Sequence, residues 1–263
     1  MIPKIIHYCW FGNGEIPEKD KINIEGWKKL CPDYEIIRWD ESNYDVHTNK
    51  YMEECYSIPK WGFVPDYVRT DIIYNYGGFY FDTDVKLLKP LDEFLNETCI
   101  MGFEKKDSIN HGHGFAAEKG NPVIKELKDF YSSIHFINRD GSLNMTASPV
   151  YITNLMVKHG LKLNGKEQYV DGVHVYPVDY FCPKNYVTGE IVITNNTVSV
   201  HHFNLSWMNK EDIDKMNKIG EYSKFIGEFL ARNIVDLSYA YKDNGIAGII
   251  KIMYKKIFKK AKK

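Results

Sequence analysis

Residues 63–85, FVPDYVRTDIIYNYGGFYFDTDV, constrain the fold and function of this chain more than any other stretch. The segment predicts a helix over about 65–76, because Pro is favoured in the first helical turn and Gly77 can supply the left-handed residue that ends it. The aromatic run that follows predicts a strand over 80–85. Residues two apart on a strand point to the same face, so Asp82 and Asp84 are expected to project together.

Two neighbouring carboxylates repel each other, and a cation between them removes that cost. Oxygen ligands of this kind suit Mg²⁺ or Mn²⁺, and these ions hold diphosphates. The carboxyl ends of strands are also where open α/β sheets bind their ligands. The acidic pair therefore predicts a divalent metal site. The alternative is a pair of solvated acids at the mouth of a loop.

The order of the elements before this segment indicates the fold class. Residues 4–11 and 34–39 are short aromatic and β-branched runs, and a helical pattern over 18–30 separates them. Strand, helix and strand at this spacing form a βαβ unit, which predicts an α/β fold with a parallel sheet. Two further helices are expected over about 210–232 and 236–260. We expect a single domain over residues 1–235 and a helical tail over 236–263.

The charge distribution singles out that tail. The formal net charge of −1 argues against nucleic acid as a partner, but residues 242–263 carry eight Lys and one acid, a net +7, so residues 1–241 carry −8. An apolar set among the lysines predicts an amphipathic helix on an anionic membrane surface. Its members are Ile249, Ile250, Ile252, Met253, Ile257 and Phe258. The alternative is a solvated helix that packs on the body of the protein.

The cysteines and the absence of sorting signals predict the compartment. Five cysteines are widely spaced, with no metal-ligand or redox spacing, which is typical of reduced thiols. The chain shows no signal-peptide pattern and no apolar run long enough to span a bilayer. We therefore expect a cytoplasmic protein, peripheral at the inner face of the membrane.

Two further pairs of residues are candidates for chemistry. Asp66 and Arg69 are three apart on the predicted helix, so they can form an ion pair beside the acidic pair, or an ordinary surface pair. His111 and His113 share a face if the chain is extended there. Two histidines alone make a poor zinc site, so a role in catalysis is favoured over metal binding.

Four blocks carry a resemblance to a known family: IPKIIHYCWFG at 2–12, PDYEIIRWDE at 32–41, DYVRTDIIYNYGGFYFDTDV at 66–85 and HHFNLSW at 201–207. In this order they resemble glycosyltransferase family 32, sugar transferases with a D-x-D motif that include yeast-type initiating mannosyltransferases and bacterial capsule enzymes. The third block is also similar to the glucosyltransferase domain of large clostridial toxins. The resemblance implies a GT-A fold, which is Rossmann-like and binds nucleotide sugars, with Mn²⁺ or Mg²⁺ as cofactor.

The resemblance also implies roles for individual residues. Trp10 matches the residue that stacks on the nucleotide base, although an aromatic side chain there could equally belong to the core. Asp66 and Arg69 match positions that hold the donor sugar and its phosphate. Tyr80 matches a contact to the ribose or diphosphate. Asp82 matches the ribose and a water-mediated metal contact.

The remaining matches complete the predicted site. Asp84 matches the direct metal ligand, and Asp82, Asp84 and Arg69 form the catalytic set. His201 is the predicted third metal contact; His202 faces the opposite way on a strand, so only one of the two can readily reach the metal. Ser206 and Trp207 match a motif that closes over the diphosphate.

These matches predict a retaining, metal-dependent hexosyltransferase, with a UDP-hexose donor favoured and a glycan or lipid-linked glycan as acceptor, as in capsular polysaccharide assembly. No nucleophile for a double displacement stands out, so front-face transfer stays open. One alternative is a metal-dependent nucleotidyl or phosphoryl transferase that uses the same acidic pair. Another is a non-catalytic sugar-binding or membrane-associated protein with a degenerate site.

Overall fold

The computed structural model describes residues 1–204, 208 and 210–260, with side chains up to residue 254. The contacts between Cα atoms divide the chain into two compact units. The first comprises Met1–Lys184 and Ile191–Trp207, and the second comprises Asn185–Glu190 and Met208–Lys263. The two units are described separately.

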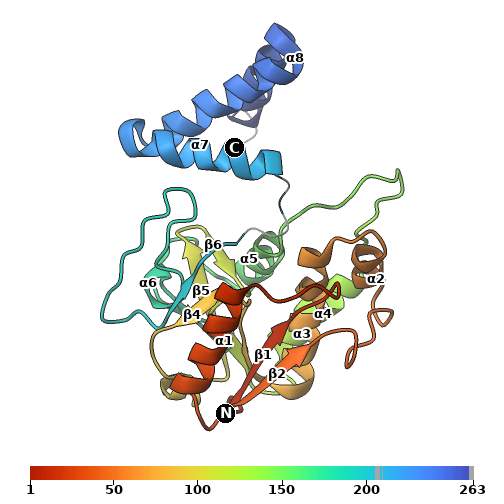
Figure 1. The fold of residues 1–263 in the computed structure, drawn as a ribbon, viewed down its shortest axis with the longest axis vertical. Helices are drawn as coiled ribbons and strands as arrows, with labels where there is room; N and C mark the ends of the chain where they lie inside the picture. Colours follow the sequence, from red (N-terminus) through yellow and green to blue (C-terminus); the bar gives the residue numbers. More distant parts are fainter. Residues whose placement is uncertain (205–207, 209, 261–263) are drawn as a thin grey trace. The chain divides into compact units, whose positions relative to one another are not determined.

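The first unit is built on a mixed sheet (Figure 1). Within the described residues its strand order is β2-β1-β3-β7-β5-β9-β8, and β6 pairs with β5. Strand β1 is parallel to β2 and β3, and β5 is parallel to β9, whereas the other pairs are antiparallel. The strands are β1 (Ile5–Cys9), β2 (Glu35–Trp39), β3 (Gly78–Tyr80), β5 (Cys99–Lys105), β6 (Ser108–Asn110), β7 (Phe115–Ala117), β8 (Gln168–Val170) and β9 (Val173–Tyr176).

The predicted βαβ unit is present and is completed by helix α1 (Glu18–Leu30) between β1 and β2. The α/β fold class is therefore confirmed. The sheet differs from the expectation in being mixed, because β7 inserts antiparallel between β3 and β5.

Helices cover both faces of this sheet (Figure 1). One face packs against α2, α3, α4 and α5, where buried residues such as Val68, Ile72 and Leu127 form the larger core. The other packs against α1 and α6, where Trp27 lies against Phe81. The elements are α2 (Lys50–Ser57), the 3₁₀ helix Trp61–Phe63, α3 (Val64–Tyr76), the 3₁₀ helix Asp92–Phe94, α4 (Pro122–Ser132), α5 (Ser148–Lys158) and α6 (Val178–Phe181).

The D-x-D segment is not a strand, and this part of the prediction is wrong. Strand β3 ends at Tyr80, and Thr83 and Asp84 lie in a turn that closes when the Val85 amide donates to the Asp82 carbonyl at 3.0 Å. The chain then leaves the main sheet as β4 (Val85–Leu87), which pairs antiparallel with β10 (Ser199–His201). The turn, and not the alternation of a strand, positions the two carboxylates.

The second unit contains α7 (Lys210–Ile226) and α8 (Glu228–Lys260) around a small core that includes Ile219, Ala231 and Val235. The two predicted helices are present, but the break between them falls at Gly227, whose φ of 76° favours glycine. Helix α8 is kinked at Asn244 and Gly245. No helix among the described residues is long and apolar enough to cross a membrane. The predicted domain boundary after residue 235 stays a prediction.

Candidate metal and nucleotide-sugar site

The predicted site residues gather at one edge of the main sheet. Strands β1 and β3 are parallel, with His7 opposite Tyr80, so the residues that follow them lie at the same edge. Trp10 comes directly after β1, and Asp82 comes two residues after β3. Trp10 is half-buried, and its indole N–H donates to the Gly14 carbonyl at 2.6 Å.

One half of the site is built around a buried arginine. Arg69 Nη2 lies 3.2 Å from Asp66 Oδ1 and 3.4 Å from Asp82 Oδ1. The guanidinium also lies over the Tyr80 ring, 4.9 Å from its centroid, and the Tyr80 hydroxyl donates to Asp82 Oδ1 at 3.0 Å. We call Asp66, Arg69, Tyr80 and Asp82 the arginine half. The Asp66–Arg69 pair is therefore no ordinary surface pair.

Burial governs the electrostatics of the arginine half. It raises the pKa of Asp66 to about 7, although the nearby Arg69 guanidinium and the Ser148 hydroxyl act in the opposite direction. Burial also raises the pKa of Asp82, against the attraction of Arg69. The Asp82 side chain nevertheless keeps 30% of its surface exposed, compared with 6% for Asp66. Asp82 is therefore the carboxylate of this half that a ligand can reach.

The other half of the site consists of Asp84 and two residues from the C-terminal part of the first unit. His201 Nε2 lies 3.2 Å from Asp84 Oδ1, and the Asn204 amide donates to Oδ2 at 2.7 Å. Burial alone would raise the pKa of Asp84, but His201 and these hydrogen bonds outweigh it and hold the pKa well below its usual range. We call Asp84, His201 and Asn204 the histidine half. Of the two neighbouring histidines, it is His201 whose side chain contacts the Asp84 carboxylate, whereas the His202 amide donates to the Asp84 carbonyl at 3.0 Å.

A third carboxylate, Asp20 on α1, is hydrogen-bonded to two residues next to Asp84 or in contact with it. Its side chain accepts from the Thr83 hydroxyl at 2.9 Å and from the Asn204 side-chain amide at 3.0 Å. Asp20 is 2% exposed, so both hydrogen bonds are shielded from water. The sequence analysis missed Asp20 and Asn204, since a lone acid on a helix and a lone amide after a strand carry no pattern.

A glycine allows the backbone to approach the acidic pair closely. The Asp82 amide donates to the Gly112 carbonyl at 2.8 Å, and the Gly112 amide donates to Asn110 Oδ1 at 2.7 Å. A Cβ at Gly112 would lie 2.1 Å from Asp82 Oδ2 and 3.0 Å from Arg69 Nη1. A larger residue at this position would therefore force the Asp82 side chain or the backbone to move.

The histidine half opens into a polar cavity of about 270 Å³. Lys19 donates to the Asn204 side chain at 2.6 Å, and Lys184 donates to the His202 carbonyl at 2.6 Å, so two ammonium groups line this cavity beside Asp84. The lining residues are Lys19, Asp20, Asn23, Asp84, Lys184, His202 and Asn204. A cavity of about 330 Å³ near Tyr44 and Asp71 contains none of the predicted site residues.

The donor set fits a divalent cation. Asp82, Asp84 and His201 each offer one ligand atom, and these atoms lie within 4.8 Å of one another. Two carboxylates are suitable ligands for Mg²⁺ or Mn²⁺. Ser206 and Trp207, which were predicted to close over the diphosphate, lie outside the described residues.

The comparison with protein families agrees with this geometry. Residues 17–101 match the family described as "Glycosyltransferase sugar-binding region containing DXD motif". The matched segment includes Asp66, Arg69, Asp82 and Asp84. Residues 17–101 are therefore similar to a glycosyltransferase sugar-binding region of the DXD type, and the resemblance predicted from the sequence is confirmed.

The individual proteins that the chain resembles are longer than this chain, and only part of each one matches it. Inositol phosphoceramide mannosyltransferase 3 of Schizosaccharomyces pombe is 37% identical over 152 residues, which cover 51% of this chain and 40% of that protein. Inositol phosphoceramide mannosyltransferase 1 of the same organism is 26% identical over 160 residues, covering 56% and 46%. The chain thus spans less than half the length of these curated relatives. A solved structure titled "PaToxG Glycosyltransferase" has 18% identity and a TM-score of 0.49 over 60% of this chain and 69% of that one.

Proposed function

We propose that this chain is a retaining GT-A glycosyltransferase that moves a hexose from a nucleotide-diphosphate sugar to a lipid-linked acceptor with the help of a divalent cation. The observation that carries the proposal is the convergence of Asp82, Asp84 and His201, within 4.8 Å of one another, beside the buried Arg69 in the segment that matches the DXD family.

In this proposal Asp84 would be the direct ligand of Mn²⁺ or Mg²⁺, and Asp82 would contact the ribose and the cation through a water, with His201 as the third group within reach. When bound, the cation supplies positive charge to the departing diphosphate. The low pKa of Asp84 supports its role, because the carboxylate is ionised throughout the physiological range.

The other side chains would orient the donor. The Arg69 guanidinium is fixed between Asp66 and Asp82 and can donate to the sugar or its phosphate without first paying the entropy of ordering a long side chain. Lys19 and Lys184 line the cavity next to Asp84, which gives an anionic diphosphate two cationic groups. Trp10, at the same sheet edge, is the proposed platform for the base.

The acceptor and the location are inferred from the relatives and the tail. The relatives are named for mannosyl transfer to inositol phosphoceramide, a lipid that carries a sugar alcohol. In the second unit, Ile246, Ile250 and Met253 are exposed at helical spacing, beside the lysines of α8. We therefore propose that the protein acts at the cytoplasmic face of an anionic membrane on a glycan lipid.

The test is a panel of nucleotide sugars with purified full-length protein. UDP-glucose, UDP-galactose, UDP-N-acetylglucosamine and GDP-mannose are each added with and without Mn²⁺, and thermal stabilisation and release of the nucleoside diphosphate are measured. We expect one donor to stabilise the protein and to be hydrolysed slowly, in both cases only with the cation. A UDP-hexose and GDP-mannose are the two leading donors.

Asp84→Asn should abolish the effect, whereas Asp107→Asn, at an exposed surface position, should retain it. Release of a nucleoside monophosphate in place of a diphosphate would indicate a phosphoryl transferase that moves the sugar phosphate, and release of a sugar phosphate would indicate a nucleotidyl transferase. If no donor stabilises the protein under any condition, the sugar-binding assignment itself fails.

A further inference from the structure

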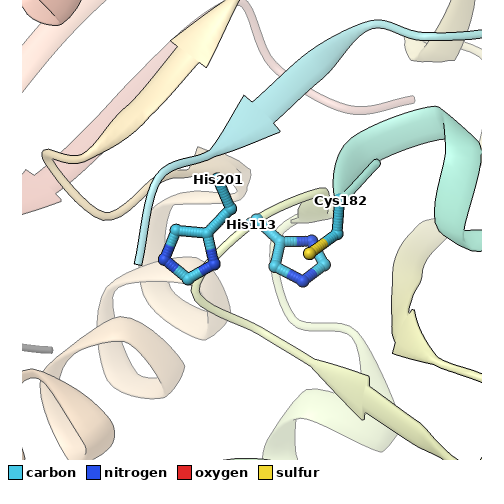
Figure 2. Close-up of side chains that lie close together, drawn as sticks. All are labelled: His113, Cys182 and His201. Atoms are coloured by element: carbon cyan, nitrogen blue, oxygen red, sulfur yellow. The ribbon is translucent and has the colours of Figure 1, made fainter. Parts of the chain in front are cut away.

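A second group of potential metal ligands shares His201 with the group formed by Asp82 and Asp84. His113, Cys182 and His201 each offer one ligand atom, and these atoms lie within 4.8 Å of one another (Figure 2). His113 lies in the turn between β6 and β7, Cys182 follows α6, and His201 ends β10. Their exposed fractions are 0%, 0% and 7%. Three elements that are distant in sequence thus bring soft ligands together in the protein interior.

The two histidine rings lack hydrogen-bond partners outside this cluster. Both ring nitrogens of His113 are buried without a hydrogen-bond partner within the described part of the chain, and the buried Nδ1 of His201 has no neighbour of this kind other than the Cys182 thiol. Leaving such a group buried and unpaired is destabilising. Burial also lowers the pKa of His113 well below its usual range, so this ring is neutral and offers a lone pair. The cluster therefore contains nitrogen atoms that are free to bind a cation.

We propose that His113, Cys182 and His201 bind a zinc-class cation, distinct from the cation of the D-x-D segment. The ligands are Cys182 Sγ, His201 Nδ1 and one ring nitrogen of His113. Thiolate and imidazole ligands select Zn²⁺ over Mg²⁺ or Mn²⁺. Three protein ligands leave the fourth tetrahedral position for a small ligand such as water.

The geometry is close to what such an ion requires. Ligand atoms around tetrahedral zinc are about 3.3–3.8 Å apart, given Zn–N and Zn–S bonds of about 2.1 and 2.3 Å. The observed limit of 4.8 Å therefore needs only small side-chain movements. The backbone around the site is closely packed: a Cβ at Gly114 would lie 2.3 Å from the Phe181 ring, next to Cys182.

Figure 2 shows His201 with one ring nitrogen turned toward His113 and Cys182 and the other turned away from them. The second nitrogen, Nε2, is the one that lies 3.2 Å from Asp84 Oδ1. With Nδ1 on zinc, Nε2 would keep its proton and donate a hydrogen bond to Asp84, as metal-bound histidines commonly do toward carboxylates. His201 would then position Asp84, in place of contacting the hard cation directly.

Binding of the cation displaces the protons that occupy the ligand atoms. Without a cation the Cys182 sulfur is a thiol, and His201 Nδ1 carries a proton whenever both nitrogens of the ring are protonated. Binding of Zn²⁺ releases the thiol proton and the Nδ1 proton of His201 to solvent. Zinc affinity should therefore rise with pH.

The experiment measures the metal directly and does not depend on glycosyl transfer. Full-length protein is stripped with a chelator and titrated with Co²⁺ in excess Mg²⁺, because Co²⁺ gives a thiolate charge-transfer band in the ultraviolet when cysteine is a ligand. We expect one equivalent of Co²⁺ with this band, and displacement by Zn²⁺. Cys182→Ser should remove the band, and His113→Ala should weaken Co²⁺ binding at least tenfold.

Two variants serve as controls. Cys31→Ser removes a buried thiol outside the cluster and should keep the band. Asp84→Asn should keep the band while losing Mn²⁺-dependent donor binding, so failure of one proposal is distinguishable from failure of the other. Absence of the band in the wild-type protein overturns the zinc proposal, whether or not the variants fold. An unchanged band in Cys182→Ser does the same.

Discussion

The arginine half and the histidine half hold two carboxylates that are two residues apart in sequence, yet they treat them in opposite ways. Asp82 forms an ion pair with Arg69 and accepts a hydrogen bond from the Tyr80 hydroxyl, and burial raises its pKa. Asp84 receives a backbone amide and the His201 imidazole, and its pKa is held well below the usual range. The same residue type therefore has two electrostatic states within one turn.

This difference indicates that the two carboxylates of the D-x-D motif have different roles. The Asp82 charge is largely balanced within the protein by Arg69, so an added cation gains less from it. Asp84 also has a cationic neighbour in His201, but its low pKa keeps the carboxylate ionised, and it lines a cavity together with Lys19 and Lys184. We therefore expect the histidine half to supply the carboxylate that holds the cation, and the arginine half to contact the sugar.

Replacing the two aspartates one at a time tests this division most severely. Asp84→Asn should lower Mn²⁺-dependent turnover about a thousandfold, because the lost carboxylate is the proposed direct ligand of the cation. Asp82→Asn should lower it only about tenfold to a hundredfold, because Arg69 already offsets that charge. Turnover and the Mn²⁺ concentration for half-maximal activity are the measurements. Equal losses in the two variants would contradict the comparison.

Gly112→Ala should disturb the arginine half and leave the histidine half in place. The new methyl group would meet Asp82 Oδ2 at 2.1 Å, so the Asp82 side chain or the backbone must move. We expect a destabilisation of about 1–3 kcal/mol and an activity loss of about a hundredfold. Chemical denaturation and donor turnover measure the two effects. Gly26→Ala, where a Cβ meets nothing within 4 Å, is the matched control and should leave both unchanged or improved.

Asp20→Asn loosens the histidine half without touching a predicted ligand. It weakens the hydrogen bonds from Thr83 and Asn204, so Asp84 should be held less firmly. We expect the Mn²⁺ concentration for half-maximal activity to rise about tenfold, as for other outer-shell partners of metal ligands, with little change in maximal turnover. A loss of maximal turnover at saturating Mn²⁺ would instead place Asp20 in the reaction itself.

Asp66→Asn should have the smallest effect, on the pH dependence of stability. The folded pKa of Asp66, about 7, lies above its ordinary value of 3.8, so the folded state binds a proton more tightly than the unfolded chain. That stabilisation is complete below about pH 4 and is lost as the pH rises through about 7. The wild-type protein should therefore lose more unfolding free energy over this window than the variant. Parallel curves from denaturant titrations would show that Asp66 does not titrate there.

The sequence was informative where the site is local. Asp66, Arg69, Asp82 and Asp84 lie within one helix and the turn after the next strand, so spacing alone placed them together. The strand predicted over 80–85 was wrong, because propensity does not show that Val85 pairs with a strand outside the main sheet. Asp20, Gly112, Cys182 and Asn204 were missed for a related reason: each reaches the site through contacts with distant parts of the chain.

The hydrogen bond between the Asn204 amide and Asp84 joins residues 120 apart, whereas the arginine half lies within residues 66–82. At a synthesis rate of about 5–20 residues per second, the partner of Asp84 leaves the ribosome on the order of ten seconds after the carboxylate itself. During that interval the Asp84 carboxylate of the nascent chain lacks both its amide and its imidazole partner. We expect the arginine half to form during translation, and the histidine half to close only when nearly the whole first unit has been made.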